Sequence, residues 1–237
     1  MANPFVRFGS AHLTVIALTF ILPFALAAIV RKAQNRALAR GISLALAAEL
    51  IATWTLWYWL IVSQGWVSVT TLLPMDLCDW AAIATLITLL WPNQRSYELA
   101  WFWSLSGTLQ ALLTPNLAYG FPDPRFIVFF GFHGGVIASV LYLTLGRGMR
   151  PWPGSIPRVI AWSFAYFLAA LATNAAFHTN FGYLRAKPEA SSLLDYLGPW
   201  PVYLFALVGL GLLFTLLLYL PFLLADQSRI LRRSRHG

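Results

Sequence analysis

The chain has 237 residues, of which 59% are hydrophobic and only 10% are charged, whereas a soluble globular domain carries about 25% charged residues. This composition excludes an ordinary soluble domain and indicates an integral membrane protein. The net charge of +8 does not indicate nucleic acid binding, because the basic residues form short clusters beside apolar runs. The single cysteine, Cys78, excludes an intramolecular disulfide.

Seven apolar runs have the length of membrane-spanning helices, which need roughly 17–25 residues. In chain order they cover residues 10–30, 40–63, 76–92, 97–114, 126–146, 158–178 and 201–225. The third and fourth runs are short and meet in a tight turn at Pro92 and Asn93, so an alternative interpretation counts them as one hairpin. The sequence predicts an all-α, polytopic membrane domain over residues 1–237, whose first span is retained rather than cleaved.

The basic residues predict the orientation of this domain. Only Arg7, Arg125, Arg185 and Lys187 fall on one side of the predicted spans. The remaining basic residues lie on the other side: Arg31, Lys32, Arg36, Arg40, Arg95, Arg147, Arg150, Arg158, Arg229, Arg232, Arg233 and Arg235. Positively charged residues accumulate on the cytoplasmic side, so the N-terminus is predicted outside and the C-terminus in the cytoplasm. That result requires an odd number of spans, which seven provides.

Polar residues within the apolar runs are expensive in lipid and usually functional. Glu49, about 13 Å from Arg40 along span two, is predicted near the middle of the membrane, facing the bundle interior. Asp76, Cys78 and Asp79 lie within about 8 Å of the outer end of span three. An aspartate at a helix N-terminus also stabilises the helix, so capping explains at least one of the two.

Further polar residues share the depth of these aspartates on the outer side. Gln110 lies one turn below the end of span four, and Asn116 follows it in the turn. His133 is about 10 Å deep in span five. Asn174 and His178 occupy the outer end of span six. Because several spans contribute to one depth, the sequence predicts a polar cavity that opens outward.

Cys78 and His133 each allow a structural and a catalytic interpretation. A lone cysteine is often a small buried hydrophobe. His133 can hydrogen-bond between helices, with Gly131, Gly134 and Gly135 permitting close approach of the backbones. In the catalytic interpretation Cys78 is a nucleophile in the first turns of a helix and His133 is its base and then an acid. The adjacent aspartates oppose formation of a thiolate.

Four blocks, in order over residues 72–205, carry a resemblance to a known family: LPMDLC, FWSLSGTLQALLTPNL, RFIVFFGFHGG and KPEASSLLDYLGPWPVY. Together they resemble the bacterial YwaF-like integral membrane proteins, which are related to the eukaryotic transmembrane protein 164 family. The resemblance implies a multi-pass protein of the bacterial cytoplasmic membrane, with eukaryotic relatives that are phospholipid acyltransferases. It implies catalytic roles for Cys78 in LPMDLC and His133 in FFGFHGG. Bacterial members often carry LPLHLC, whereas this chain has Asp76 at the histidine position, so assistance from that histidine is absent here.

The resulting prediction is an acyltransferase with membrane lipids as substrates and partners. Cys78 and His133 are the predicted catalytic residues. The predicted substrate-binding residues are Asp76, Asp79, Gln110, Asn116, Asn174, His178 and Glu49, of which Gln110, Asn116 and Asn174 are the candidate oxyanion donors. No cofactor or metal is predicted, because the histidines lack zinc-site spacing and no phosphate loop is present. The oligomeric state is left open.

Two other functions are compatible with the same residues. Glu49, His133 and Asp76 would form a proton or ion relay in a small-solute transporter, although the spans below Glu49 are nearly free of polar residues. A non-catalytic membrane protein is the second alternative. A retinal-binding protein is excluded, because the only lysines, Lys32 and Lys187, lie in loops.

Overall fold

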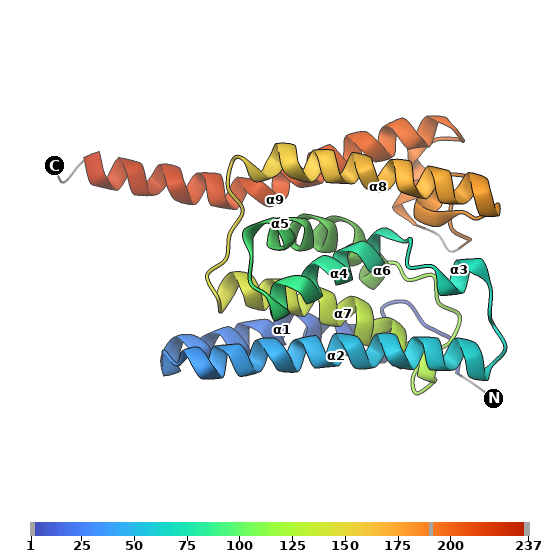
Figure 1. Ribbon diagram of the computed structural model, residues 1–237, viewed down its shortest axis with the longest axis horizontal. Coiled ribbons are helices and arrows are strands. Elements are labelled where there is room, and N and C mark those ends of the chain that lie inside the picture. The colour runs from blue at the N-terminus through green and yellow to red at the C-terminus, as the bar shows by residue number, and fades with distance from the viewer. Residues whose placement is uncertain (1–2, 190–191, 235–237) are drawn as a thin grey trace.

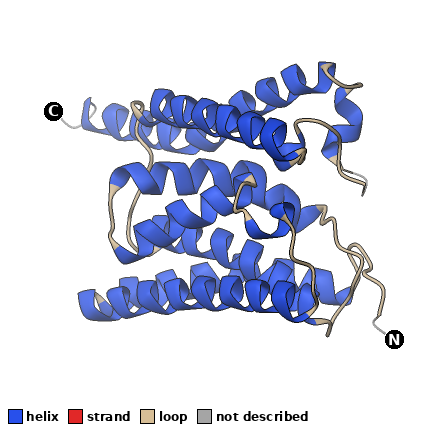
Figure 2. Ribbon diagram, turned by 45° about the vertical axis from the view of Figure 1, so that its right-hand side comes forward, coloured by secondary structure: helices blue, strands red, loops and turns tan. Residues whose placement is uncertain are grey.

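The computed structural model describes residues 3–189 and 192–234, which form an assembly of helices (Figures 1 and 2). Within these residues the only β interaction is an isolated bridge between Pro4 and Tyr119. The predicted all-α class is therefore confirmed.

Six helical segments of the described chain are long and apolar enough to cross a membrane. They are α1 (Ser10–Ala33), α2 (Arg36–Ser63), the segment Val69–Leu90 with α3 (Val69–Leu72) and α4 (Leu77–Leu90), α7 (Pro124–Leu145), α8 (Ser155–Phe177) and α9 (Val202–Ser234). Each overlaps one of the predicted spans. Large apolar side chains such as Ile21, Phe205 and Leu216 are exposed on these helices, as expected for a surface solvated by lipid.

The predicted span over residues 97–114 is helical but interrupted. It consists of α5 (Gln94–Trp103), a π-helical segment η1 (Ser104–Thr108) and α6 (Leu109–Leu113). A Cβ at Gly107 would lie 2.8 Å from Cδ2 of Leu77, so the glycine lets η1 approach the first turn of α4. π-helical turns are frequent at functional sites.

Local sequence sets where the helices that carry the site begin. Asn35 accepts hydrogen bonds from the N–H groups of Ala37 and Leu38 and caps α2. Asp123 accepts from the N–H of Arg125, and Pro124 follows as the first residue of α7. These caps satisfy backbone donors that the first turn of a helix leaves without intrahelical acceptors.

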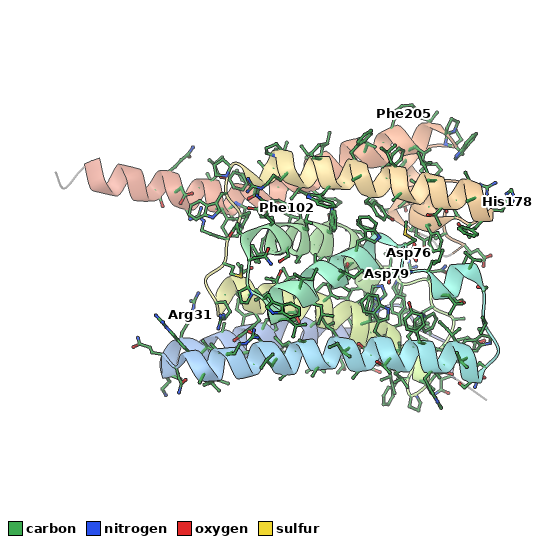
Figure 3. All side chains as sticks on the ribbon, viewed as in Figure 1. Arg31, Asp76, Asp79, Phe102, His178 and Phe205 are labelled. Atoms are coloured by element: carbon green, nitrogen blue, oxygen red, sulfur yellow. The ribbon has the colours of Figure 1, made fainter. Side chains whose placement is uncertain are left out.

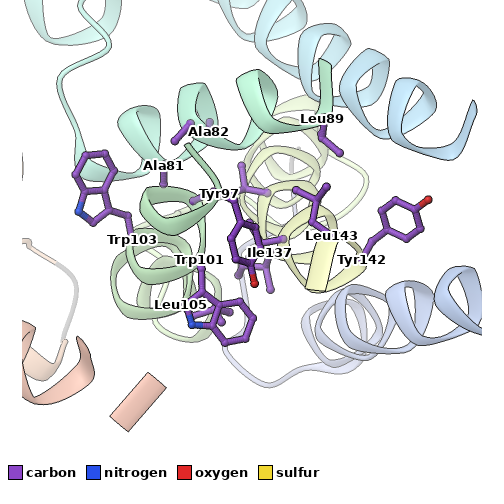
Figure 4. Close-up of a cluster of buried hydrophobic side chains, with 14 of the residues drawn as sticks. Ala81, Ala82, Leu89, Tyr97, Trp101, Trp103, Leu105, Ile137, Tyr142 and Leu143 are labelled. Atoms are coloured by element: carbon purple, nitrogen blue, oxygen red, sulfur yellow. The ribbon is translucent and has the colours of Figure 1, made fainter. Parts of the chain in front are cut away.

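Helix α7 is at the centre of the assembly. Of its apolar window 61% is buried, compared with 11% for α9. Helices α1 and α2 pack on one side of α7 and α4 on another, while α8 and α9 form a separate layer next to α5 (Figure 1). The core between α4, α5 and α7 includes Tyr97, Ile137 and Leu143 (Figure 4).

The two ends of the bundle differ in charge. At one end Arg31 donates to the carbonyl of Leu145, and Arg40 donates to the carbonyls of Leu89 and Leu90. These bonds bring the start of α2 and the ends of α1, α4 and α7 together. The two chain termini point to opposite ends of the long axis (Figure 1). Arg235 lies outside the described residues, as do the side chains of residues 229–234.

Candidate functional site

A cavity of about 1000 Å³ surrounds the first turn of α4. Its walls come from α2, α4, the η1–α6 segment, α7, α8 and α9. The predicted site residues that line it are Asp76, Cys78, Asp79, Gln110, Asn116 and His133. The structure thus brings most of the predicted polar residues into one space.

The two aspartates organise the start of α4. The N–H of Asp76 donates to Oδ2 of Asp79 at 3.0 Å, which is one half of a capping box. Oδ1 of Asp76 accepts the N–H of Gly182 at 3.4 Å, so Asp76 also links α4 to the loop after α8. The capping role predicted for at least one aspartate is confirmed. Figure 3 labels both residues near the start of α4, below α8 in that view.

Cys78 follows the cap in the first turn of α4 and has a free, half-buried thiol. Its neighbours include Thr108 of η1, whose hydroxyl is buried and completes no hydrogen bond with a described residue. The thiol therefore lies between the cavity and the π-helical segment. The Cys78 side chain also lines the cavity.

His133 is oriented by its own helix. Its Nδ1 lies 2.7 Å from the carbonyl oxygen of Phe129, and its ring stacks on Phe129 with centroids 4.2 Å apart. A carbonyl oxygen only accepts, so Nδ1 carries the proton and Nε2 of the neutral ring presents a lone pair. Among the described residues no hydrogen bond joins His133 to another helix or to Cys78. Both side chains line one cavity.

The prediction that Asn174 and His178 line the cavity is wrong, because neither side chain is among its lining residues. Asn174 is buried and bonds to the N–H and carbonyl of Phe181 and to the hydroxyl of Thr179, which folds the chain after α8. His178 is exposed at the tip of α8 in a left-handed conformation, with φ of 55° (Figure 3). Depth along a helix fixes the height of a residue but not the wall that it faces.

Glu49, the predicted binding residue that was placed deeper than the others, also lies outside the main cavity, so the structure does not group it with the other predicted binding residues. It lines a separate cavity of about 680 Å³ between α1, α2 and α7. Its Oε2 is buried without a hydrogen-bond partner, and a Cβ at Gly135 would overlap that oxygen. Because Glu49 and His133 face different cavities, the geometry does not support the predicted relay of Glu49, His133 and Asp76.

Sequence reasoning missed Tyr166, which also lines the main cavity. Its hydroxyl is buried beside the start of α4 and approaches the N–H of Leu77 without completing a hydrogen bond. The ring packs edge-on against Trp80, with centroids 5.4 Å apart. Tyrosine carries no charge, so it does not stand out in an apolar span. The only indication of Tyr166 in the sequence is its polar hydroxyl in the middle of span six.

Arg125 is a second residue that sequence reasoning did not assign to the site. It lines the cavity and its guanidinium lies 3.1 Å from the ring centroid of Tyr119. Its Nε and Nη2 donate to Asp123 at 2.7 and 2.6 Å. These hydrogen bonds hold the pKa of the Asp123 carboxyl below its ordinary value. The resulting ion pair is a fixed charged group where the cavity meets the loop before α7.

Tyr183, in the loop after α8, completes the polar lining. Burial raises the pKa of its hydroxyl, and the negative charge of Asp76 raises it further. Tyr183 therefore stays protonated and is available as a hydrogen-bond donor beside Asn116.

A comparison with protein families returned the TMEM164 family, whose model matches residues 7–219. The matched region includes every residue that lines the main cavity. No curated protein and no solved structure matches the chain. The family resemblance predicted from the sequence blocks is confirmed.

Proposed function

Because the chain belongs to the TMEM164 family, we propose that it is a membrane-bound acyltransferase that moves a fatty acyl chain between phospholipids. The observation that carries this proposal is the shared cavity of Cys78 and His133, with its polar groups at the start of α4 and apolar walls elsewhere. The apolar walls include Phe102, Phe164, Phe167, Leu207, Val208 and Phe214. Such a space suits an ester group at its polar end and an acyl chain along its walls.

In the first half-reaction Sγ of Cys78 attacks the ester carbonyl carbon of a donor phospholipid. An S–C bond forms, the ester C–O bond breaks, and the thiol proton passes to Nε2 of His133 and then to the leaving oxygen of the lysophospholipid. In the second half-reaction a lysophospholipid hydroxyl attacks the thioester and loses its proton to His133. The C–S bond breaks and the thiolate of Cys78 recovers the proton.

Cys78 and His133 make no direct hydrogen bond, so the proton crosses the cavity through an intervening water or after closure around a substrate. Catalytic hydrogen bonds are often long in substrate-free enzymes and shorten in the substrate complex. The tautomer of His133 suits proton transfer from the thiol. Its Nδ1–H donates to the carbonyl of Phe129, so the lone pair is on Nε2.

We further propose seven crossings of the bacterial cytoplasmic membrane, with the N-terminus outside. The interrupted segment α5–η1–α6 supplies the seventh crossing. The positions of the chain ends at opposite ends of the bundle support an odd number of crossings (Figure 1). The basic cluster around Arg31 and Arg40 supports a cytoplasmic location for that end.

The test of the acyl-transfer proposal is an assay in proteoliposomes with a labelled donor phospholipid and an unlabelled lysophospholipid. We expect Cys78→Ser and His133→Ala to lower the rate at least 100-fold, since each removes a reacting group (on the order of 10²-fold or more for such groups). His178→Asn is the matched control, because His178 lies outside the cavity and asparagine tolerates its left-handed backbone. Full activity of Cys78→Ser would refute the mechanism.

A further inference from the structure

The hydroxyl of Tyr166 is held against the start of α4 without a completed hydrogen bond. Tyr166 is 8% exposed, and its hydroxyl oxygen is buried. Its ring packs on Trp80, which packs in turn on Trp103 at a centroid distance of 6.1 Å. The indole N–H of Trp103 donates to Ser163 at 2.9 Å, which ties this aromatic row to α8. The hydroxyl is therefore fixed in position, although nothing in the described chain satisfies it.

The surrounding backbone shows where this hydroxyl points. A Cβ at Gly182 would lie 2.9 Å from it, and Gly182 has φ of +65°, so the loop passes directly over the hydroxyl. The N–H of Gly182 donates to Asp76, the N-cap of α4. Cys78 and the amide of Leu77 are among the other neighbours of Tyr166. The hydroxyl thus faces the turn of α4 that carries the thiol.

The same turn of α4 offers backbone donors. The first N–H groups of a helix have no intrahelical acceptor. In α4 the N–H groups of Asp79 and Trp80 reach the carbonyl of Asp76, at 3.0 and 3.3 Å. The N–H groups of Leu77 and Cys78 make no such bond to the backbone. The Tyr166 hydroxyl and these two amide donors therefore lie at the turn of α4 that carries Cys78.

We propose that the Tyr166 hydroxyl and the first-turn N–H groups of α4 bind the oxyanion formed when Cys78 attacks an acyl carbonyl. This inference rests on the proposed acyl transfer. As the S–C bond forms, the π electron pair of the carbonyl moves onto its oxygen, where these donors stabilise it. The pair returns to re-form C=O as the ester C–O bond breaks. Tyr166 donates a hydrogen bond throughout and transfers no proton.

This assignment replaces two of the three oxyanion donors predicted from the sequence, Asn174 and Asn116, whereas Gln110 still lines the cavity. The amide of Asn174 is occupied by Thr179 and Phe181 and lies outside the cavity. Asn116 is exposed, beside Tyr183 in the loop region. Tyr166, in contrast, lines the cavity, and its buried hydroxyl has no hydrogen-bond partner among the described residues.

The test uses the fact that Cys78 is the only cysteine, so every thiol adduct reports on one site. The purified full chain is treated separately with p-nitrophenyl butyrate and with iodoacetamide. The ester forms an S–C bond, passes through an oxyanion and expels p-nitrophenolate, whereas iodoacetamide expels iodide without an oxyanion. We expect Tyr166→Phe to slow acylation on the order of 100-fold, the usual cost of one oxyanion donor. Alkylation should change less than twofold.

Tyr219→Phe is the matched control. Tyr219 also has a buried hydroxyl without a hydrogen-bond partner, but it does not line the cavity, so both rates should stay at wild-type values. An equal effect of Tyr166→Phe on both reagents would show that Tyr166 only shapes the site, and the proposal would fall. A thiol that neither reagent reaches would also overturn it, because no carbonyl could then approach Sγ.

The phospholipid assay separates this inference from the proposed function. If wild type transfers no acyl chain between phospholipids but Tyr166→Phe selectively slows the ester reaction, the function fails and the oxyanion site stands. If wild type transfers acyl chains and Tyr166→Phe alters neither this rate nor the selectivity between the two reagents, only the oxyanion site fails.

Discussion

At the residue scale, some residues of the candidate site can be recognised from the sequence and others cannot. Cys78 and His133 stand out because a lone thiol and an ionisable ring are rare in apolar runs. Tyr166 does not, since it is a common residue of membrane helices. Asn174 was predicted to line the cavity and does not, because the direction in which a side chain points around its helix depends on packing that the sequence does not specify.

The ion pair of Asp123 and Arg125 gives a prediction for pH at this scale. The pKa of Asp123 is lowered in the fold, so the pair stabilises above the unfolded value of about 3.9 and this contribution is lost as pH falls through the folded value. Asp123→Asn keeps a side-chain oxygen for capping and removes the charge. Thermal unfolding in detergent should show a slightly lower Tm for the variant at neutral pH.

The difference between the two proteins should disappear in acid, where wild-type Asp123 is also neutral. A Tm difference that persisted unchanged below the folded pKa would contradict an electrostatic origin. Raising the salt concentration at neutral pH is the control, because screening weakens a partly exposed pair such as this one.

At the element scale, glycines decide how closely α7 approaches its neighbours. A Cβ at Gly131 would lie 2.8 Å from Cγ2 of Thr53 on α2, and one at Gly134 would lie 2.7 Å from Oγ1 of Thr19 on α1. The close approach predicted from these glycines is therefore confirmed, but the hydrogen bond of His133 stays within α7. Hydropathy predicted the helices, whereas it gave no indication of the π-helical interruption at η1, which depends on packing against α4.

Gly135 provides a test of the packing between α2 and α7. We expect Gly135→Ala to destabilise the protein by about 1–3 kcal/mol, because the new Cβ overlaps the carboxylate of Glu49 and overpacking has this typical cost. In a Glu49→Ala background the same substitution should cost much less, since the overlapping group is gone. The measurement is a double-mutant cycle of thermal unfolding in detergent. Additive effects would show that Glu49 is not the limiting contact.

At the scale of the whole molecule, α8 and α9 supply one side of the main cavity, and α2 and α7 supply other walls. In Figure 1, α8 and α9 lie together as a separate layer. On the basic side, the layer is held by ion pairs between Arg158 of α8 and Glu98 of α5 and between Arg150 and Asp226 of α9. The sequence predicted the charge asymmetry that these pairs reflect. It could not predict them individually, because they join segments far apart in the chain.

The interrupted segment α5–η1–α6 decides the topology, and reporter fusions test it. With seven crossings, reporters in the α1–α2 turn, in the segment 146–154 and after the C-terminus should all be cytoplasmic. A green fluorescent protein should then fluoresce at the C-terminus and alkaline phosphatase should be inactive there. If the segment entered and left on the same side, everything after residue 114 would reverse while the α1–α2 turn would not. Phosphatase activity at the C-terminus together with a cytoplasmic α1–α2 turn would therefore exclude the seventh crossing.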